Sequence, residues 1–348
     1  MSARSVGALD YNLDGLLDLF VVEDKFGSRQ KARSVLLKNA GKLRFKVANA
    51  EAGLPDDIYG LGLAIADLND DGRADIFITH SNRLFLSQGS RFREVSTLNN
   101  VFAWQPLDGE DWPSGAAFGD LNRDGKLDLV IGVHHDPARN RIFMNQGIRD
   151  GIPRFIDITS KAGLPPRFSQ KCPHVEIQDF DNDGWPDIYF SAAWKNGKEI
   201  VPVIYRNRGV QPDGLPRFDL ARNGQGKIVY FPAGPTADFD RDGRLDLFLG
   251  NWFRGESCRL LKNRTSTGNW IQVKAPIGSR VKLISQNRLI GYQQVQTGFG
   301  YSSGQLPVNH FGVGDLRSVE IEVRLPDGRT ERKHAVAVNR RIEFGQRS

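Results

Sequence analysis

The stretch that decides the fold is DFDRDGRLDLFLG, residues 238–250. Four aspartates lie within its first nine residues, and a run of strand-forming apolar residues follows directly. Aspartates this close repel one another unless a cation lies among them. The pattern occurs four more times, as DYNLDGLLD from Asp10, DLNDDGRAD from Asp67, DLNRDGKLD from Asp120 and DFDNDGWPD from Asp179. The copies start 57, 53, 59 and 59 residues apart, and so regular a period predicts a repeat architecture.

Each copy has Asp at position 1, Asn or Asp at position 3, Asp at positions 5 and 9, and Gly at position 6. Alternating oxygen ligands around a glycine turn suit Ca²⁺, which takes about six to eight oxygens. Position 7 varies in chemistry, so we expect its backbone carbonyl to be the ligand, and about five Ca²⁺ ions to bind. At position 4 of the third copy, Arg123 is expected to point away from the ion. The predicted metal ligands are Asp10, Asn12, Asp14, Leu16, Asp18, Asp67, Asn69, Asp71, Arg73, Asp75, Asp120, Asn122, Asp124, Lys126, Asp128, Asp179, Asp181, Asp183, Trp185, Asp187, Asp238, Asp240, Asp242, Arg244 and Asp246.

The loops differ from an EF-hand, which needs a bidentate Glu at position 12. Position 12 is apolar in every copy and lies in a predicted strand: Val21, Ile78, Ile131, Phe190 and Leu249. We therefore expect each loop to form the tip of a β-hairpin. An Asp- and Gly-rich turn without metal would explain one copy, but five copies in register favour calcium.

Each repeat contains a second hairpin signal, in which a hydrophobic strand leads to a Gly turn and then to a Phe strand, as in LFLSQGSRF. A repeat thus holds about four strands, and four-stranded units repeated radially form a β-propeller. The predicted fold class is all-β, with a propeller of about five recognisable four-stranded blades and a small C-terminal β-domain.

These hairpins resemble the FG-GAP/VCBS repeats of integrin α-chain propellers. The C-terminal segments NWIQVKAPIGSRVKLIS, GYSSGQLPVNHFGVGD and VEIEVRLPDGRTE resemble an ASPIC/UnbV domain. A propeller followed by this domain is the layout of the cartilage acidic protein family. The resemblance implies a propeller at 1–267, an ASPIC/UnbV-like β-domain at 268–348, and a role in adhesion. The link after NWIQVK is shorter than in the family, and five calcium motifs are fewer than a seven-bladed ring would carry.

The two ends of the predicted ring are irregular. The fifth copy runs into RTSTGNWIQV where a Gly turn and Phe strand are expected, so its outer strand should be missing. The ring could close imperfectly, the C-terminal domain could help to seal it, or the chain could be the latter part of a longer gene, which the abrupt start favours a little. In the C-terminal domain, RLPDGRT is predicted to be a hairpin turn and HAVAVNRRIEF the last strand.

The distribution of charged residues indicates which binding partners the protein favours. The five nine-residue motifs hold 18 Asp against 5 Lys or Arg, whereas the remainder holds 42 Lys or Arg against 23 Asp or Glu. This excess of basic residues favours an acidic partner such as anionic polysaccharide, lipid headgroups or nucleic acid. Because the sequence has no contiguous basic run, Lys and Arg side chains scattered over solvated loops are the simpler interpretation. We find no recognition helix or stacking motif for specific nucleic-acid binding. Cys172 and Cys258 are expected to be free thiols, with one disulfide as the alternative.

Location and ligand face are predicted together. No apolar run reaches the roughly 18 residues of a membrane span, and we do not expect the opening residues MSARSVGALDYNLDG to be a signal peptide. We expect an extracellular or periplasmic protein, and a truncated N-terminus is one possibility. Turns opposite the calcium loops collect aromatic and His side chains, which suit a protein or glycan ligand, unless they merely pack the blades. The predicted ligand-binding residues are His80, His134, His135, Trp112, Trp194 and Trp252.

The sequence thus predicts a calcium-binding adhesion or ligand-binding module without enzyme activity. The alternative is a calcium-dependent enzyme acting on acidic polysaccharide. Its acid or base would be one of six carboxylates: Asp56, Asp57, Asp108, Glu110, Asp111 and Asp136. A purely structural domain is the third possibility.

Overall fold

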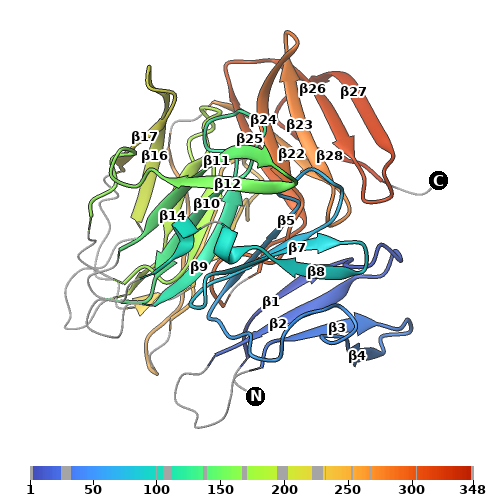
Figure 1. Cartoon of the computed structure of the whole chain (residues 1–348). Coiled ribbons are helices and arrows are strands. Elements are labelled where there is room, and N and C mark those ends of the chain that lie inside the picture. The colour runs from blue at the N-terminus through green and yellow to red at the C-terminus, as the bar shows by residue number, and fades with distance from the viewer. Residues whose placement is uncertain are drawn as a thin grey trace.

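Each repeat folds into one antiparallel sheet whose first two strands flank the aspartate loop (Figure 1). The computed structural model describes residues 3–24, 33–98, 100–104, 112–135, 139–166, 171–193, 203–221, 230–231, 233–251, 254–265, 268–302 and 304–345. Both Cys172, which is buried, and Cys258, which is exposed, are free thiols, as predicted.

The first four repeats form four-stranded sheets. Their strands are β1 (Ala3–Leu9), β2 (Asp18–Glu23), β3 (Val35–Asn39) and β4 (Phe45–Val47); β5 (Leu63–Ala66), β6 (Asp75–Ile78), β7 (Arg83–Gln88) and β8 (Arg91–Glu94); β9 (Pro113–Gly119), β10 (Asp128–Val133), β11 (Arg141–Arg149) and β12 (Ile152–Asp157); and β13 (Val175–Gln178), β14 (Asp187–Phe190), β16 (Val203–Val210) and β17 (Pro216–Leu220). Two short 3₁₀ helices, η1 (Ser96–Leu98) and η2 (Asn100–Phe102), follow β8.

The fifth repeat lacks the outer strand within the described residues, as its sequence predicts. Its sheet contains β19 (Thr236–Ala237), β20 (Asp246–Leu249) and β21 (Arg259–Leu261). A separate two-stranded sheet pairs β15 (Ala192–Ala193) with β18 (Tyr230–Phe231).

The loop backbone explains why glycine recurs at position 6. Gly15, Gly72, Gly125, Gly184 and Gly243 have φ angles of 86°, 91°, 82°, 93° and 85°, a region that side chains with a β-carbon rarely enter. Position 4 is also left-handed in all five loops, although none of its residues is glycine: Leu13, Asp70, Arg123, Asn182 and Arg241. The glycine requirement is therefore readable from sequence, whereas the second left-handed position is not.

The sheets are arranged as propeller blades. The first strands of neighbouring sheets contact each other in the order β1, β5, β9 and β13. Between the sheets lie apolar clusters to which both neighbours contribute; Phe20 and Phe85, for example, share one cluster. In β6, Ile76 faces the first sheet and Phe77 the third, so the strand is buried on both faces. Inner strands therefore read as continuous apolar runs, and the predicted all-β propeller is confirmed.

The C-terminal strands form two packed sheets with their own core around Val281 and Ile321. The strands are β22 (Asn269–Lys274), β23 (Arg280–Ser285), β24 (Arg288–Gln294), β25 (Val308–Gly314), β26 (Ser318–Arg324), β27 (Thr330–Ala337) and β28 (Arg340–Glu343). The predicted turn between β26 and β27 is confirmed. The predicted last strand is wrong, because HAVAVNRRIEF divides at Asn339, whose φ is 59°, and β28 then pairs in parallel with β22.

The described residues between β24 and β25, 295–302 and 304–307, reach the inner strands of the propeller, and we call them the axial segment. Gly300 N–H donates to the Ala116 carbonyl at 2.6 Å, and the Gly298 carbonyl accepts from Ile65 N–H at 3.1 Å. Tyr301 N–H donates to His174 Nδ1 at 2.9 Å. The axial segment therefore contacts the inner strands of several blades. Such contacts are what we expect if the C-terminal domain helps to seal the ring.

Candidate metal loops and the opposite face

The aspartate at position 9 ties each loop to its blade. Its Oδ2 atom accepts the N–H of position 2 at 2.9–3.3 Å, and its Oδ1 atom accepts an N–H just beyond or within the third strand at 2.7–2.8 Å. The five aspartates are Asp18, Asp75, Asp128, Asp187 and Asp246. Because each carboxylate oxygen has two lone pairs, this tie leaves capacity for a metal ion.

Positions 1 and 5 shape the loop itself. The Oδ2 atom of position 1 accepts the N–H of the position 6 glycine at 2.8–3.1 Å in every copy. The Oδ1 atom of position 5 accepts the N–H of position 7 at 2.8–3.0 Å. These bonds fix the position 1 and position 5 carboxylates within the loop.

Several loop carboxylates have raised pKa values, chiefly at positions 1 and 9. Burial, followed by the neighbouring Asp183 and Asp181 charges, raises the pKa of Asp179 to about 8. Burial is also the main reason that the pKa of Asp120 is raised to about 7. The pKa values of Asp75 and Asp128 lie well above the usual range for the same reason. The loops thus hold desolvated carboxylates whose charge a bound cation would neutralise.

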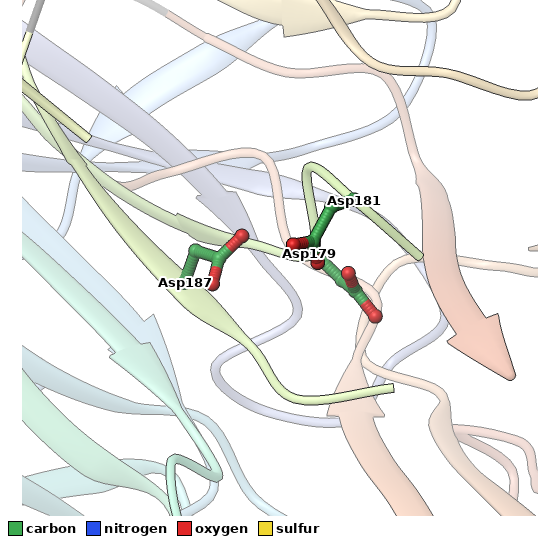
Figure 2. A group of neighbouring side chains, drawn as sticks. All are labelled: Asp179, Asp181 and Asp187. Atoms are coloured by element: carbon green, nitrogen blue, oxygen red, sulfur yellow. The ribbon is translucent and has the colours of Figure 1, made fainter. Parts of the chain in front are cut away.

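The fourth and fifth loops bring three carboxylates together. In the fourth, one oxygen each of Asp179, Asp181 and Asp187 lies within 4.8 Å of the others (Figure 2). Asp238, Asp240 and Asp242 form the same kind of group in the fifth loop. These are the two copies with Asp at position 3, where the other three have Asn.

Oxygen atoms in these two loops also lack partners. The Oδ1 atoms of Asp179, Asp181 and Asp238 are shielded from solvent and accept no hydrogen bond from the described residues. In the first three loops, by contrast, Oδ1 of position 1 accepts the N–H of position 5 at 3.0–3.2 Å. The donor set of clustered, unpartnered carboxylate oxygens fits a hard divalent cation.

Basic side chains from elsewhere also reach the loops. Arg123 leaves its own loop and lies over the Trp185 ring, with its guanidinium carbon 3.7 Å from the ring centre. The Asp179 and Asp183 charges act on it there. In the fifth loop, Lys262 pairs with Asp240. The charge of Arg123, at position 4 of the third loop, therefore acts on the fourth loop. The sequence of the third repeat alone does not reveal this interaction.

The C-terminal strands touch the loops directly. Gln294 forms two hydrogen bonds with the Asp67 backbone, at 2.7 and 2.8 Å, and Arg280 lies 3.1 Å from the Asp67 carboxylate. His310 Nε2 lies 2.7 Å from Asn182 Oδ1. Gln272 donates to Asp238 at 3.1 Å. Sequence reasoning missed these residues because their partners lie in other repeats, far away along the chain.

The face opposite the loops gathers three of the predicted ligand residues. The His80 ring packs edge-on against Tyr59 at 5.1 Å between centroids and lies 5.5 Å from the Trp112 ring. His134 lies 6.2 Å from the Tyr301 ring, and burial, then Lys171, lowers its pKa to about 4.

The other predicted residues of this face are not placed with them. His135 follows His134 and is half-buried. Trp194 and Trp252 lie outside the described residues.

A buried carboxylate lies beside this aromatic group. Asp24 has a fully buried side chain, 3.4 Å from His80 Nδ1 and 3.8 Å from Arg4 Nε. Neither carboxylate oxygen accepts a hydrogen bond from the described residues, nor does the nearby Ser81 hydroxyl make one. A buried carboxylate that accepts no hydrogen bond within the described part of the chain is uncommon.

The six carboxylates predicted as the acid or base of a polysaccharide-cleaving enzyme form no described site. Asp56 and Asp57 are exposed, and each forms an ion pair, with Arg33 and Arg83 respectively, at 2.9 Å. Asp108, Glu110, Asp111 and Asp136 lie outside the described residues.

The blades and their in-register aspartate loops define a repeat-built β-propeller. The FG-GAP-like repeat family matches residues 10–78, 120–190 and 179–249, more than half of the chain, so the protein belongs to that family. Residues 272–348 match the family described as ASPIC and UnbV. The protein is thus an FG-GAP-like repeat protein with an ASPIC/UnbV region.

The chain is similar to several curated relatives. The chain is 28% identical to Cartilage acidic protein 1 of Mus musculus over 357 residues, covering 94% of this chain and 52% of the relative. It is 26% identical to Integrin alpha-4 of Xenopus laevis over 153 residues, covering 42% of this chain and 14% of that one. The chain spans about half the length of the cartilage acidic proteins it matches.

One solved structure, titled for recognition of non-reducing terminal N-acetylglucosamine by an Agrocybe aegerita lectin, aligns with a TM-score of 0.41 at 15% identity, covering 97% of this chain and 81% of that chain. Among the described residues, no helix has the length and apolar character needed to cross a membrane.

Proposed function

We propose that this protein is an extracellular calcium-binding propeller that acts as an adhesion or ligand-binding module rather than as an enzyme. Five in-register loops with desolvated carboxylates carry the calcium assignment, most directly the unpartnered Asp179 and Asp238 oxygens. Similarity to cartilage acidic protein and to an integrin α-chain supports adhesion and an extracellular location.

Calcium titration and thermal melting of the protein test the calcium assignment. Extracellular calcium modules bind at roughly 10⁻⁴–10⁻³ M, so a few millimolar Ca²⁺ should stabilise by on the order of 1–2 kcal/mol per site. Chelation should therefore lower the melting temperature by many degrees, and Ca²⁺ should restore it better than Mg²⁺. Asp183→Ala should lose one site in calorimetry, whereas Asp150→Ala, on an exposed turn, should lose none. A melting temperature unaffected by chelator would overturn the assignment.

We place the ligand, a protein or a glycan, on the face opposite the loops. The aromatic group around His80 and the buried Asp24 support this placement. Trp194 and Trp252 stay part of the prediction. A panel of extracellular-matrix proteins and glycans, screened with and without Ca²⁺, would identify the ligand.

Variants then locate the site. His80→Ala with Trp112→Ala should weaken binding about tenfold or more, because buried aromatic anchors contribute about 2 kcal/mol or more each. The calcium stoichiometry should stay unchanged, and His334→Ala, on exposed β27, is the matched control. Equal affinity per folded molecule in the double variant would remove this face from consideration.

A further inference from the structure

A groove of about 450 Å³ lies between the C-terminal sheet and the second and third aspartate loops, away from the aromatic face. Its C-terminal wall is the sheet β24-β23-β26-β27. Five cationic side chains line it: Lys126, Arg280, Lys282, Arg324 and Arg332. Its carboxylates are fewer: Asp67, Asp70 and Glu322.

The cations share one face because strand residues alternate. In β23, Val281 and Leu283 are buried in the C-terminal core, so Arg280 and Lys282 project to the other side. In β26, Val323 is buried and Arg324 projects outward. Strand pairing therefore aligns these side chains along the groove.

Two arginines stand directly opposite each other in this wall. Arg280 on β23 is the cross-strand partner of Arg324 on β26, and like charges in that position are destabilising. Arg280 is compensated by Asp67 at 3.1 Å and by Asp70. Arg324 has no ion pair within the described part of the chain and is exposed.

The next row also has a cation without an ion pair among the described residues. Glu322 lies between Lys282 and Arg332 in the sheet register. It accepts a hydrogen bond from Arg332 Nε at 2.7 Å. Lys282 is exposed and has no ion pair with any described residue. The wall therefore presents two diagonally placed cations, Lys282 and Arg324, that lack an ion pair within the described residues. A bound anion would relieve the repulsion between the arginines.

We propose that this groove binds an acidic polysaccharide through its sulfate or carboxylate groups, held by Lys282 and Arg324. Arginine recognises such planar or tetrahedral oxyanions with paired hydrogen bonds. Thr330 in the lining is exposed and can bind a sugar hydroxyl. A recessed groove suits a narrow chain better than a flat bilayer. The aromatic side chain of the lining, Tyr292, is only 7% exposed, so it offers no stacking platform for nucleic-acid bases.

The test measures heparin and chondroitin sulfate binding by calorimetry, with the full chain in calcium buffer and at several salt concentrations. Lys282→Ala with Arg324→Ala should weaken binding at least tenfold. The slope of log affinity against log salt should fall by about one to two, because fewer counterions are released. Arg93→Ala with Arg288→Ala removes two other exposed cations and should change neither quantity appreciably.

Melting temperatures keep the result interpretable. The double variant should melt at or above the native temperature, since a like-charge contact is relieved. If it fails to fold, Lys282→Gln with Arg324→Gln takes its place. Unchanged heparin affinity in the folded variant overturns the proposal, as does equal binding of anionic vesicles or single-stranded DNA by the native protein. Since the groove lies apart from the aromatic face, this result does not decide the proposed function.

Discussion

At position 9 of each loop, one aspartate bridges the hairpin and the chain at the third strand. We therefore expect Asp128→Ala to lower the free energy of unfolding by about 2–5 kcal/mol in chelator, because the N–H groups of Leu121 and Asn145 lose their acceptor. Asp219→Ala, in a surface pair with Arg208, should change it by less than about 0.5 kcal/mol. Denaturant titration measures both. Equal losses would show that position 9 is not a structural tie.

Arg123 offers a second residue-scale prediction. It is a cation beside the fourth loop, so Arg123→Ala should strengthen calcium binding there a few-fold by removing competing charge from Asp179 and Asp183. Arg241→Ala, at the same position of the fifth loop, is the control and should have less effect. Calorimetry on both variants distinguishes them. Weaker binding in Arg123→Ala would mean that its packing on Trp185 orders the loop.

At the scale of the loop, pH should control how much calcium stabilises the fold. Burial raises the pKa of Asp120 to about 7 and of Asp179 to about 8 from 3.8. The metal-free folded state therefore binds these protons more tightly than the unfolded chain. The contribution of these two groups to the stability of the metal-free fold is greatest below about pH 4 and is lost as pH rises through 7 to 8.

Calcium replaces those protons, so the melting-temperature difference between Ca²⁺ and chelator should be larger at about pH 8 than at about pH 5.5. Differential scanning calorimetry measures it. Asp120→Asn with Asp179→Asn should flatten the pH dependence of the metal-free protein. A difference that does not vary with pH would contradict the role of these two carboxylates.

Sequence reasoning reached the blades because their signals are local. The aspartate spacing, the position 6 glycine and the apolar strand after each loop all lie within about a dozen residues. The interactions of Arg123, Gln294 and His310 were not predictable, because each depends on how separate repeats and the C-terminal strands meet. The split of the last strand at Asn339 likewise depends on pairing with β22.

At the scale of the whole molecule, the loops are the surface on which the C-terminal strands rest. The proposed boundary near residue 268 is thus also a contact surface, where a β-carbon on Gly243 would collide with Trp270. We expect chelation to increase hydrogen exchange in β22 and β25 before it does so in β6 or β10. Mass spectrometry of exchanged peptides measures this order. Simultaneous exchange in all four strands would show that the molecule opens as one unit.

The axial segment places a late part of the chain against early strands, with Gly300 bonded to Ala116 and Gly298 to Ile65. The ribosome adds roughly 5–20 residues per second, so the axial segment is synthesised about 10–50 seconds after the inner strands that it contacts. During that interval the nascent ring exposes the polar backbone and the apolar side chains that the segment later covers. Completion of this propeller therefore depends on the C-terminal quarter of the chain. A chain released before that quarter is made would be a substrate for chaperones and proteases.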